Sequence, residues 1–74
     1  MGSILVTGCS GLVGTHLVHK LLEKGHKVVG VDIKHSTALP EVSENFIFDD
    51  MDLRDADDVN ILFNEFKFDG VINC

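Results

Sequence analysis

The stretch TGCSGLVG, residues 7–14, decides the fold of this chain. Its three glycines, Gly8, Gly11 and Gly14, are spaced three apart, and each is expected to serve a different purpose. Gly8 permits a sharp turn out of a preceding strand, and Gly11 leaves no side chain between the backbone and a phosphate. Gly14 allows the following helix to lie close to that strand. Such a turn is typical of sites that bind the pyrophosphate of a dinucleotide.

The sequence on either side of the turn supplies the context that this motif needs. Residues 3–7 (SILVT) form a short β-branched run, as in a strand buried on both faces. Over residues 12–24 apolar side chains recur at helical spacing, and Gly25 suits the left-handed position that ends a helix. The free N–H groups of the first helical turn, around Leu12 and Val13, would donate to phosphate oxygens.

The rest of the chain continues the alternation of strands and helices. We expect strands at residues 27–32, 45–48 and 70–74, a loop over residues 33–44, and a second helix over residues 55–66. The buried stripe of that helix is predicted to consist of Val59, Leu62, Phe63 and Phe66.

This order of elements predicts an α/β fold, the N-terminal half of a Rossmann fold. The four strands are expected to form a parallel sheet in spatial order 3-2-1-4 with flanking helices. Residues 1–74 would then be a partial, truncated NAD(P)-binding domain, because the last strand lacks the cover that a parallel strand needs on both faces.

Asp32 ends the second predicted strand and is the expected selector of the cofactor. Its carboxylate can accept hydrogen bonds from both hydroxyls of the adenosine ribose of NAD, and it would repel the 2′-phosphate of NADP. Lys34 stands two residues further on and could soften that repulsion. We therefore expect NAD, with NADP less favoured.

Composition narrows the classes of partner. The 74 residues carry a net charge of −6, which argues against nucleic acid as a partner. No apolar run is long enough for a membrane span or a signal peptide. Cys9 and Cys74 fit neither a disulfide framework nor a zinc spacing, so reduced thiols and a cytoplasmic location are expected. No metal site is predicted from the histidines. Cys9 is interpreted as a small packing residue, with a reactive thiol of lowered pKa as the alternative.

Three further motifs make a family resemblance specific. Residues 7–14 (TGCSGLVG), 28–32 (VVGVD), 52–55 (DLRD) and 71–74 (VINC) together resemble the extended short-chain dehydrogenase/reductase family. The pattern is most similar to NAD-dependent epimerase/dehydratases of nucleotide sugars, of the UDP-glucose 4-epimerase type. Asn73 replaces the usual His of the last motif, as in the related dTDP-4-dehydrorhamnose reductases.

The resemblance implies a cofactor site in which Asp52 and Leu53 line the adenine. The motif turn and the ends of the neighbouring strands complete it, giving as predicted cofactor-binding residues Gly8, Ser10, Gly11, Leu12, Val13, Gly14, Asp32, Ile33, Lys34, Asp52 and Leu53.

The resemblance also implies what this stretch lacks. The family's catalytic Tyr-x-x-x-Lys comes later, and the chain contains no Tyr, so it is expected to hold no catalytic residue and to be inactive alone. The complete protein would be a homodimeric NAD-dependent enzyme acting on a nucleotide sugar. A non-catalytic NAD(P)-binding regulator and a family member with a non-sugar substrate are the alternatives, and a downstream Tyr-x-x-x-Lys would separate enzyme from regulator.

Overall fold

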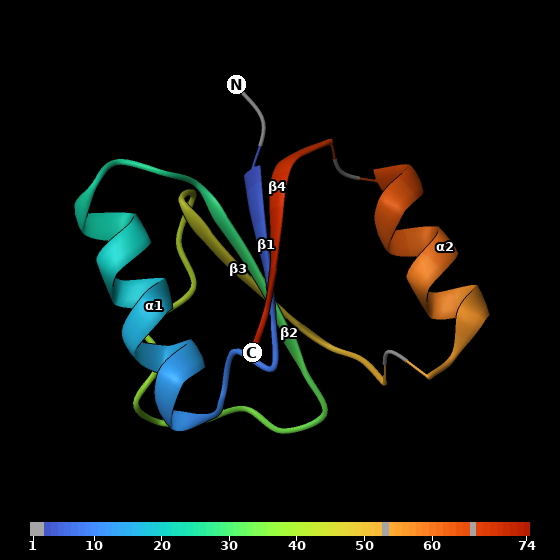
Figure 1. The fold of residues 1–74 in the computed structure, drawn as a ribbon, viewed down its shortest axis with the longest axis horizontal. Helices are drawn as coiled ribbons and strands as arrows, with labels where there is room; N and C mark the ends of the chain where they lie inside the picture. Colours follow the sequence, from blue (N-terminus) through green and yellow to red (C-terminus); the bar gives the residue numbers. More distant parts are fainter. Residues whose placement is uncertain (1–2, 53, 66) are drawn as a thin grey trace.

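A computed structural model of the chain describes residues 3–52, 54–65 and 67–74. The elements follow in the order β1 (Ser3–Thr7), α1 (Leu12–Glu23), β2 (Val28–Asp32), β3 (Phe46–Asp50), α2 (Ala56–Glu65) and β4 (Phe68–Asn73). The strands form one parallel sheet in the order β3-β2-β1-β4 (Figure 1). The predicted α/β fold and its strand order 3-2-1-4 are therefore confirmed.

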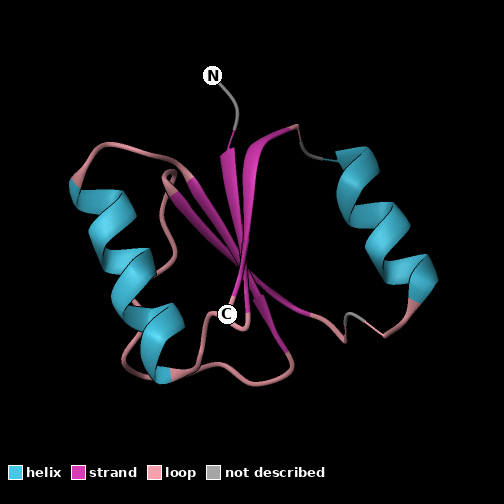
Figure 2. Cartoon of the chain, in the orientation of Figure 1, coloured by secondary structure: helices cyan, strands magenta, loops and turns pink. Residues whose placement is uncertain are grey.

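The two helices cover opposite faces of the sheet (Figure 2). Two buried clusters result, one on each face. The cluster on the α1 side contains Val6, Cys9, Val18, Val28, Leu39 and Phe46. The cluster on the other side contains Leu5, Val29, Val31, Met51 and Leu62. Adjacent residues of β1 and β2 alternate between the clusters, which explains why these central strands read as continuous apolar runs.

Gly25 ends α1 as its position predicts. It has φ of +88°, where glycine is favoured, and its N–H donates to the Leu22 carbonyl at 3.0 Å. The N–H of His26 reaches back to the Leu21 carbonyl at 3.1 Å, which completes a Schellman ending. The helix stops at Glu23, one residue before the predicted end.

The predicted bounds of three strands need correction. β2 begins at residue 28 rather than 27, and β3 runs over residues 46–50 rather than 45–48 because Asp49 and Asp50 pair with the end of β2. β4 begins at Phe68, two residues earlier than predicted. The register shifts between Ser3 and Ile4, so that Phe68 lies opposite Ser3 and Gly70 opposite Ile4. The sequence Asp-Gly at this shift is typical of a turn, so the sequence does not indicate that the strand begins before it.

The apolar stripe of α2 is narrower than predicted. Leu62 is buried and Val59 half-buried, whereas Phe63 is 50% exposed and packs edge-to-face on Phe68. The prediction that Phe63 is buried is therefore wrong, because no element of the described part covers the outer side of β4. Phe66, also predicted for the stripe, lies outside the described residues. In the part of the chain that the structure describes, no helix is long and apolar enough to cross a membrane.

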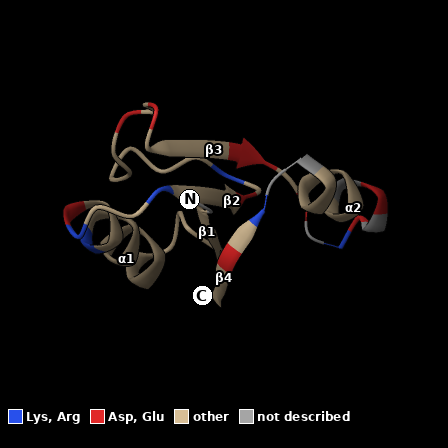
Figure 3. Cartoon of the chain, turned by 90° about the horizontal axis from the view of Figure 1, so that it is seen from above, with Lys and Arg blue, Asp and Glu red and all other residues tan. Residues whose placement is uncertain are grey.

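The carboxyl ends of the parallel strands meet at one edge of the sheet. The turn after β1, the loop after β2 and the connection after β3 all lie along this edge (Figure 1). Acidic residues gather at the end of β3 and along α2 (Figure 3). Ligands of open α/β sheets bind at this edge, where two crossovers diverge from neighbouring strands.

Candidate functional site

The glycine turn joins β1 to α1 with the tight geometry that its sequence predicts. Gly8 has φ of +65°, and a side chain there would lie 2.7 Å from the Cys74 carbonyl oxygen. A Cβ on Gly14 would lie 2.4 Å from the Gly8 carbonyl oxygen and 2.8 Å from the Cys9 Cα, so glycine alone allows this approach of α1. Gly11 is different. The one neighbour that its Cβ would have within 4 Å is the Gly8 oxygen, at an ordinary 3.5 Å.

The N-terminus of α1 opens at this turn. Gly11 caps the helix with extended backbone (φ −74°, ψ 174°), and its carbonyl accepts from the Thr15 N–H at 2.9 Å. The preceding bond runs from the Gly11 N–H to the Gly8 carbonyl at 3.2 Å. The next residues, Leu12 and Val13, are 88% and 70% exposed. Their N–H groups belong to the first helical turn, which has no intrahelical acceptors, and together with the helix dipole they form a site suited to an anion.

Asp32 stands at the end of β2, directly beside the turn. Its carboxylate accepts from the Ser10 N–H at 3.0 Å and from the Ile33 N–H at 2.7 Å. These two backbone donors, one on each oxygen, fix the orientation of the side chain. A carboxylate has about four acceptor positions, so acceptor capacity remains for hydroxyl donors. The carboxylate of the half-buried Asp32 is therefore fixed in orientation and can still accept hydrogen bonds from a ligand.

A cavity of about 290 Å³ joins these parts, lined by Thr7, Gly8, Val31, Asp32, Ile33, Met51 and Cys74. It brings together three predicted site residues: Gly8, Asp32 and Ile33. A second hollow of about 290 Å³ lies along the outer face of α1, lined by Val13, His16, Leu17 and Lys20. We regard the first as the candidate site, because polar groups from the turn and β2 converge on it and the second is a stripe of one helix.

Ser10 and Lys34 lie at the same edge of the sheet, and they are hydrogen-bonded to each other. The Ser10 hydroxyl donates to the Lys34 carbonyl oxygen and accepts from the Ser36 N–H at 3.2 Å. The Lys34 side chain is exposed. The sequence therefore placed both residues correctly near Asp32, but it gave no sign that they are bonded to each other.

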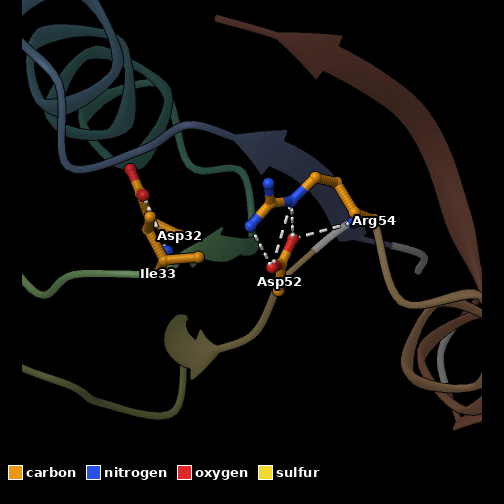
Figure 4. A network of polar contacts seen from close by, with 4 residues as sticks. All are labelled: Asp32, Ile33, Asp52 and Arg54. Carbon is orange, nitrogen blue, oxygen red and sulfur yellow. Dashed lines mark hydrogen bonds and ion pairs between the residues drawn. The ribbon is translucent and has the colours of Figure 1, made fainter.

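Asp52 is one residue beyond Met51, whose N–H donates to the Asp32 carbonyl at 3.0 Å. Its carboxylate forms a bidentate pair with the Arg54 guanidinium, with Nη2 to Oδ2 at 2.8 Å and Nε to Oδ1 at 3.0 Å (Figure 4). Hydrogen bonding from the Arg54 side chain is the main cause that lowers the Asp52 pKa from 3.8 to about 2. Leu53, predicted beside it for the adenine, lies outside the described residues.

Cys9 is a packing residue. It is fully buried on the α1 side of the sheet, and burial is the main cause that raises its pKa to about 11. The alternative of a reactive thiol with a lowered pKa is wrong, because the apolar surroundings disfavour the thiolate more than the turn stabilises it.

Three residues near the site were not among the predicted cofactor-binding residues. Met51 lines the cavity, Arg54 holds Asp52, and Asn73 accepts a 2.5 Å hydrogen bond from the Thr7 hydroxyl across β1 and β4. Arg54 carried a usable signal, since a cation two residues from Asp52 can pair with it in a turn. The hydrogen bond between Thr7 and Asn73 has no signal in the sequence, because it depends on strand register.

Comparison with known proteins agrees with this geometry. The sequence profile described as "NAD dependent epimerase/dehydratase family" matches residues 4–74. The chain belongs to this family. Among the relatives of the epimerase/dehydratase chain are a UDP-glucose 4-epimerase of Pisum sativum, 38% identical over 95% of this chain and 23% of the relative, and protein CapI of Staphylococcus aureus, 37% identical over 95% and 24%.

Solved structures place the epimerase/dehydratase chain in the same family of folds. The Bordetella bronchiseptica enzyme WbmH, solved in complex with NAD+, superposes with a TM-score of 0.86 at 31% identity, covering 100% of this chain and 25% of that one. A UDP-glucose 4-epimerase gives 0.83 at 34% identity, covering 96% and 22%. The chain spans about a quarter of the length of the relatives that it matches.

Proposed function

We propose that this chain is the NAD-binding part of an NAD-dependent enzyme that acts on a nucleotide-linked sugar. The observation that carries the proposal is the start of α1, which opens beside the held carboxylate of Asp32. An N-terminus that attracts phosphate and an acceptor for ribose hydroxyls are the two groups that a dinucleotide needs. Family membership supports the proposal, as do the relative WbmH with NAD+ and the relative WbmG with NAD and UDP.

The residues take the following roles in this proposal. The pyrophosphate lies over Gly11, Leu12 and Val13, and the adenosine ribose bonds to Asp32. Gly8 and Gly14 shape the turn, while Ser10, Ile33 and Lys34 border the ribose. The adenine lies near Asp52 and Leu53. This last part rests on the family's D-[LI]-R-D motif, which the sequence contains as residues 52–55.

NAD is proposed over NADP because of the charge at Asp32. Two charge-assisted hydrogen bonds to the ribose would each contribute about 1.5–3 kcal/mol. A 2′-phosphate would instead meet this carboxylate with like charge. Lys34 forms no ion pair with Asp32 in the described part of the chain, and a lysine lacks the planar fork by which arginine binds phosphate.

Catalysis is proposed for the complete protein and not for this stretch, which contains no Tyr. Bound NAD supplies a hydride acceptor and donor, and the residues described here bind and orient it. A homodimer and a nucleotide-sugar substrate are proposed by resemblance to the family. A cytoplasmic location is proposed because Cys9 and Cys74 are both free thiols.

The test is an NAD titration by calorimetry on the complete protein and its Gly11→Val variant. The backbone of Gly11 suits any residue and its Cβ has room, so the variant should fold. Its side chain would occupy the place of the pyrophosphate, and NAD binding should be lost. Gly70→Val is the matched control, since a Cβ there meets nothing within 4 Å and lies at the amino end of β4. Unchanged NAD affinity in Gly11→Val would overturn the assignment.

A further inference from the structure

The hydroxyl of Ser10 joins the glycine turn to the loop that follows β2. It donates to the Lys34 carbonyl oxygen and accepts from the Ser36 N–H at 3.2 Å. Ser36 in turn accepts from the Ala38 N–H at 3.1 Å through its own hydroxyl. One side chain of the turn therefore fixes the first residues of a loop that is 24 residues away in sequence.

The backbone of the same residue holds the carboxylate beside that loop. The Ser10 N–H donates to Asp32 Oδ2 at 3.0 Å, and the Ile33 N–H donates to Oδ1 at 2.7 Å. Ser10 thus contacts both the ribose acceptor of the proposed site and the backbone of Lys34, the one cation close to it in sequence. Among the described residues, Ser10 alone is hydrogen-bonded to both Asp32 and Lys34.

We propose that Ser10 is a positioning residue for cofactor selection: its hydroxyl fastens Lys34 and Ser36 to the glycine turn and so keeps the Lys34 ammonium from reaching a 2′-phosphate beside Asp32. The inference rests on the proposed binding of NAD. It assigns Ser10 a role other than direct contact through its hydroxyl, whose single proton is already donated to Lys34.

The contacts explain why the hydrogen bonds of the Ser10 hydroxyl affect the choice between NAD and NADP. Lys34 forms no ion pair with Asp32 among the described residues, although only Ile33 separates them. A lysine ammonium can reach a phosphate only within the length of its four-carbon side chain, so a shift of the Lys34 backbone changes which positions it can reach. The Lys34 carbonyl is held by Ser10, and the Lys34 residue is exposed. Without that bond the loop can bring the ammonium toward a 2′-phosphate.

Loss of the Ser10 hydroxyl should loosen this segment without unfolding it. The Ser10 N–H that supports Asp32 remains in Ser10→Ala. A second anchor lies further along the loop, where the His19 ring nitrogen Nε2 is 2.8 Å from the Ala38 carbonyl oxygen. The loosened stretch is therefore limited to the residues between Asp32 and Ala38.

The experiment measures the dissociation constants of NAD and NADP separately on the complete protein. In Ser10→Ala the Kd for NAD should rise about fivefold, the equivalent of one net hydrogen bond. The Kd for NADP should stay within about twofold, because the freed ammonium compensates for the looser loop, so the NADP-to-NAD ratio of Kd values should fall about fivefold. Ser43→Ala is the matched control. Its hydroxyl also accepts backbone N–H groups of this loop, from Asn45 and Phe46, but at the far end.

A double-mutant cycle separates this role from simple support of the loop. Lys34→Ala keeps the carbonyl that Ser10 holds and removes only the ammonium. In the Lys34→Ala background, Ser10→Ala should no longer change the ratio. Equal loss of both cofactors in Ser10→Ala, or a fivefold effect of Lys34→Ala alone, would overturn the inference. An unmodified protein that binds neither cofactor would instead overturn the proposed function.

Discussion

Replacing Gly14 by alanine should destabilise the fold around the glycine turn, although alanine is the better helix former. The new Cβ would lie 2.4 Å from the Gly8 carbonyl oxygen, 2.8 Å from the Cys9 Cα and 3.0 Å from the Cys9 carbonyl carbon. All three are backbone atoms, which cannot rotate away as the end of a side chain could. Carbon atoms pack best at about 3.5–4.0 Å, so either α1 or the turn must move by about an ångström.

The turn cannot move without losing hydrogen bonds. The Gly8 carbonyl accepts from the Gly11 N–H at 3.2 Å, and the Cys9 N–H donates to the Val31 carbonyl at 3.3 Å. Overpacking in such a site costs about 1–3 kcal/mol, and contacts this short belong at the upper end. Alanine offsets about 1 kcal/mol through its helix propensity. We expect a net loss of about 2 kcal/mol.

Hydrogen exchange followed by mass spectrometry can measure this loss locally, even within a larger protein. Amides of β1 and α1 in Gly14→Ala should exchange roughly 30-fold faster, the equivalent of about 2 kcal/mol. Gly11→Ala is the matched control. Its Cβ has an ordinary contact, and the loss of a good capping glycine is offset by a less flexible unfolded chain, so exchange should change by less than about threefold. Equal protection in Gly14→Ala and the unmodified protein would refute the reasoning.

Three further predictions follow from the charged and buried groups of the site. Asp32→Ala should weaken NAD binding at least about tenfold and narrow the preference over NADP, because charge-assisted bonds to the ribose are lost; titration of both cofactors checks this, with the exposed Asp50→Ala of the neighbouring strand as control. Arg54→Ala should return the Asp52 pKa from about 2 toward 3.8, visible in the carboxyl ¹³C shift. Since the folded pKa is the lower one, the stability that this pair contributes is present above about pH 4 and is lost as pH falls toward 2, and the variant should lose that dependence. Cys9, with its pKa of about 11, should resist iodoacetamide at pH 8 until the protein is unfolded in urea, whereas the exposed Cys74 should react; labelling of Cys9 in the native protein at the rate of Cys74 would contradict this.

The glycine turn could be predicted from sequence because its constraints are local. Gly8 needs a positive φ, Gly14 needs a close approach, and Gly25 needs the left-handed ending of α1. Each requirement excludes nearly every other residue type, so the spacing of the glycines, with the apolar runs on either side, predicts a strand, a turn and a helix. The parallel order of the sheet then follows from the alternation of elements.

Features that depend on strand register or tertiary contact could not be predicted. The early start of β4 arises from a shift in strand register opposite Ser3 and Ile4. Phe63 of α2 is exposed because no described element covers the outer side of β4, on which it packs. The two hydrogen bonds of the Ser10 hydroxyl depend on where the loop after β2 returns to the turn. None of these has a period or a spacing that a single sequence displays.

Two glycines of the turn have different roles, since Gly14 is needed for folding and Gly11 is proposed to be needed for binding. This difference decides how variants of the turn should be interpreted. At Gly14 a methyl group meets backbone, so binding lost in Gly14→Ala would report a displaced helix. At Gly11 a methyl group makes only an ordinary 3.5 Å contact with the Gly8 oxygen, so binding lost in Gly11→Val, with exchange unchanged, would report a ligand that needs that space. If the turn were only a structural bend, Gly11→Val would show no effect beyond the loss of a capping glycine. The pair therefore separates a dinucleotide site from a tight turn of the same shape, because only a bound phosphate makes Gly11 matter.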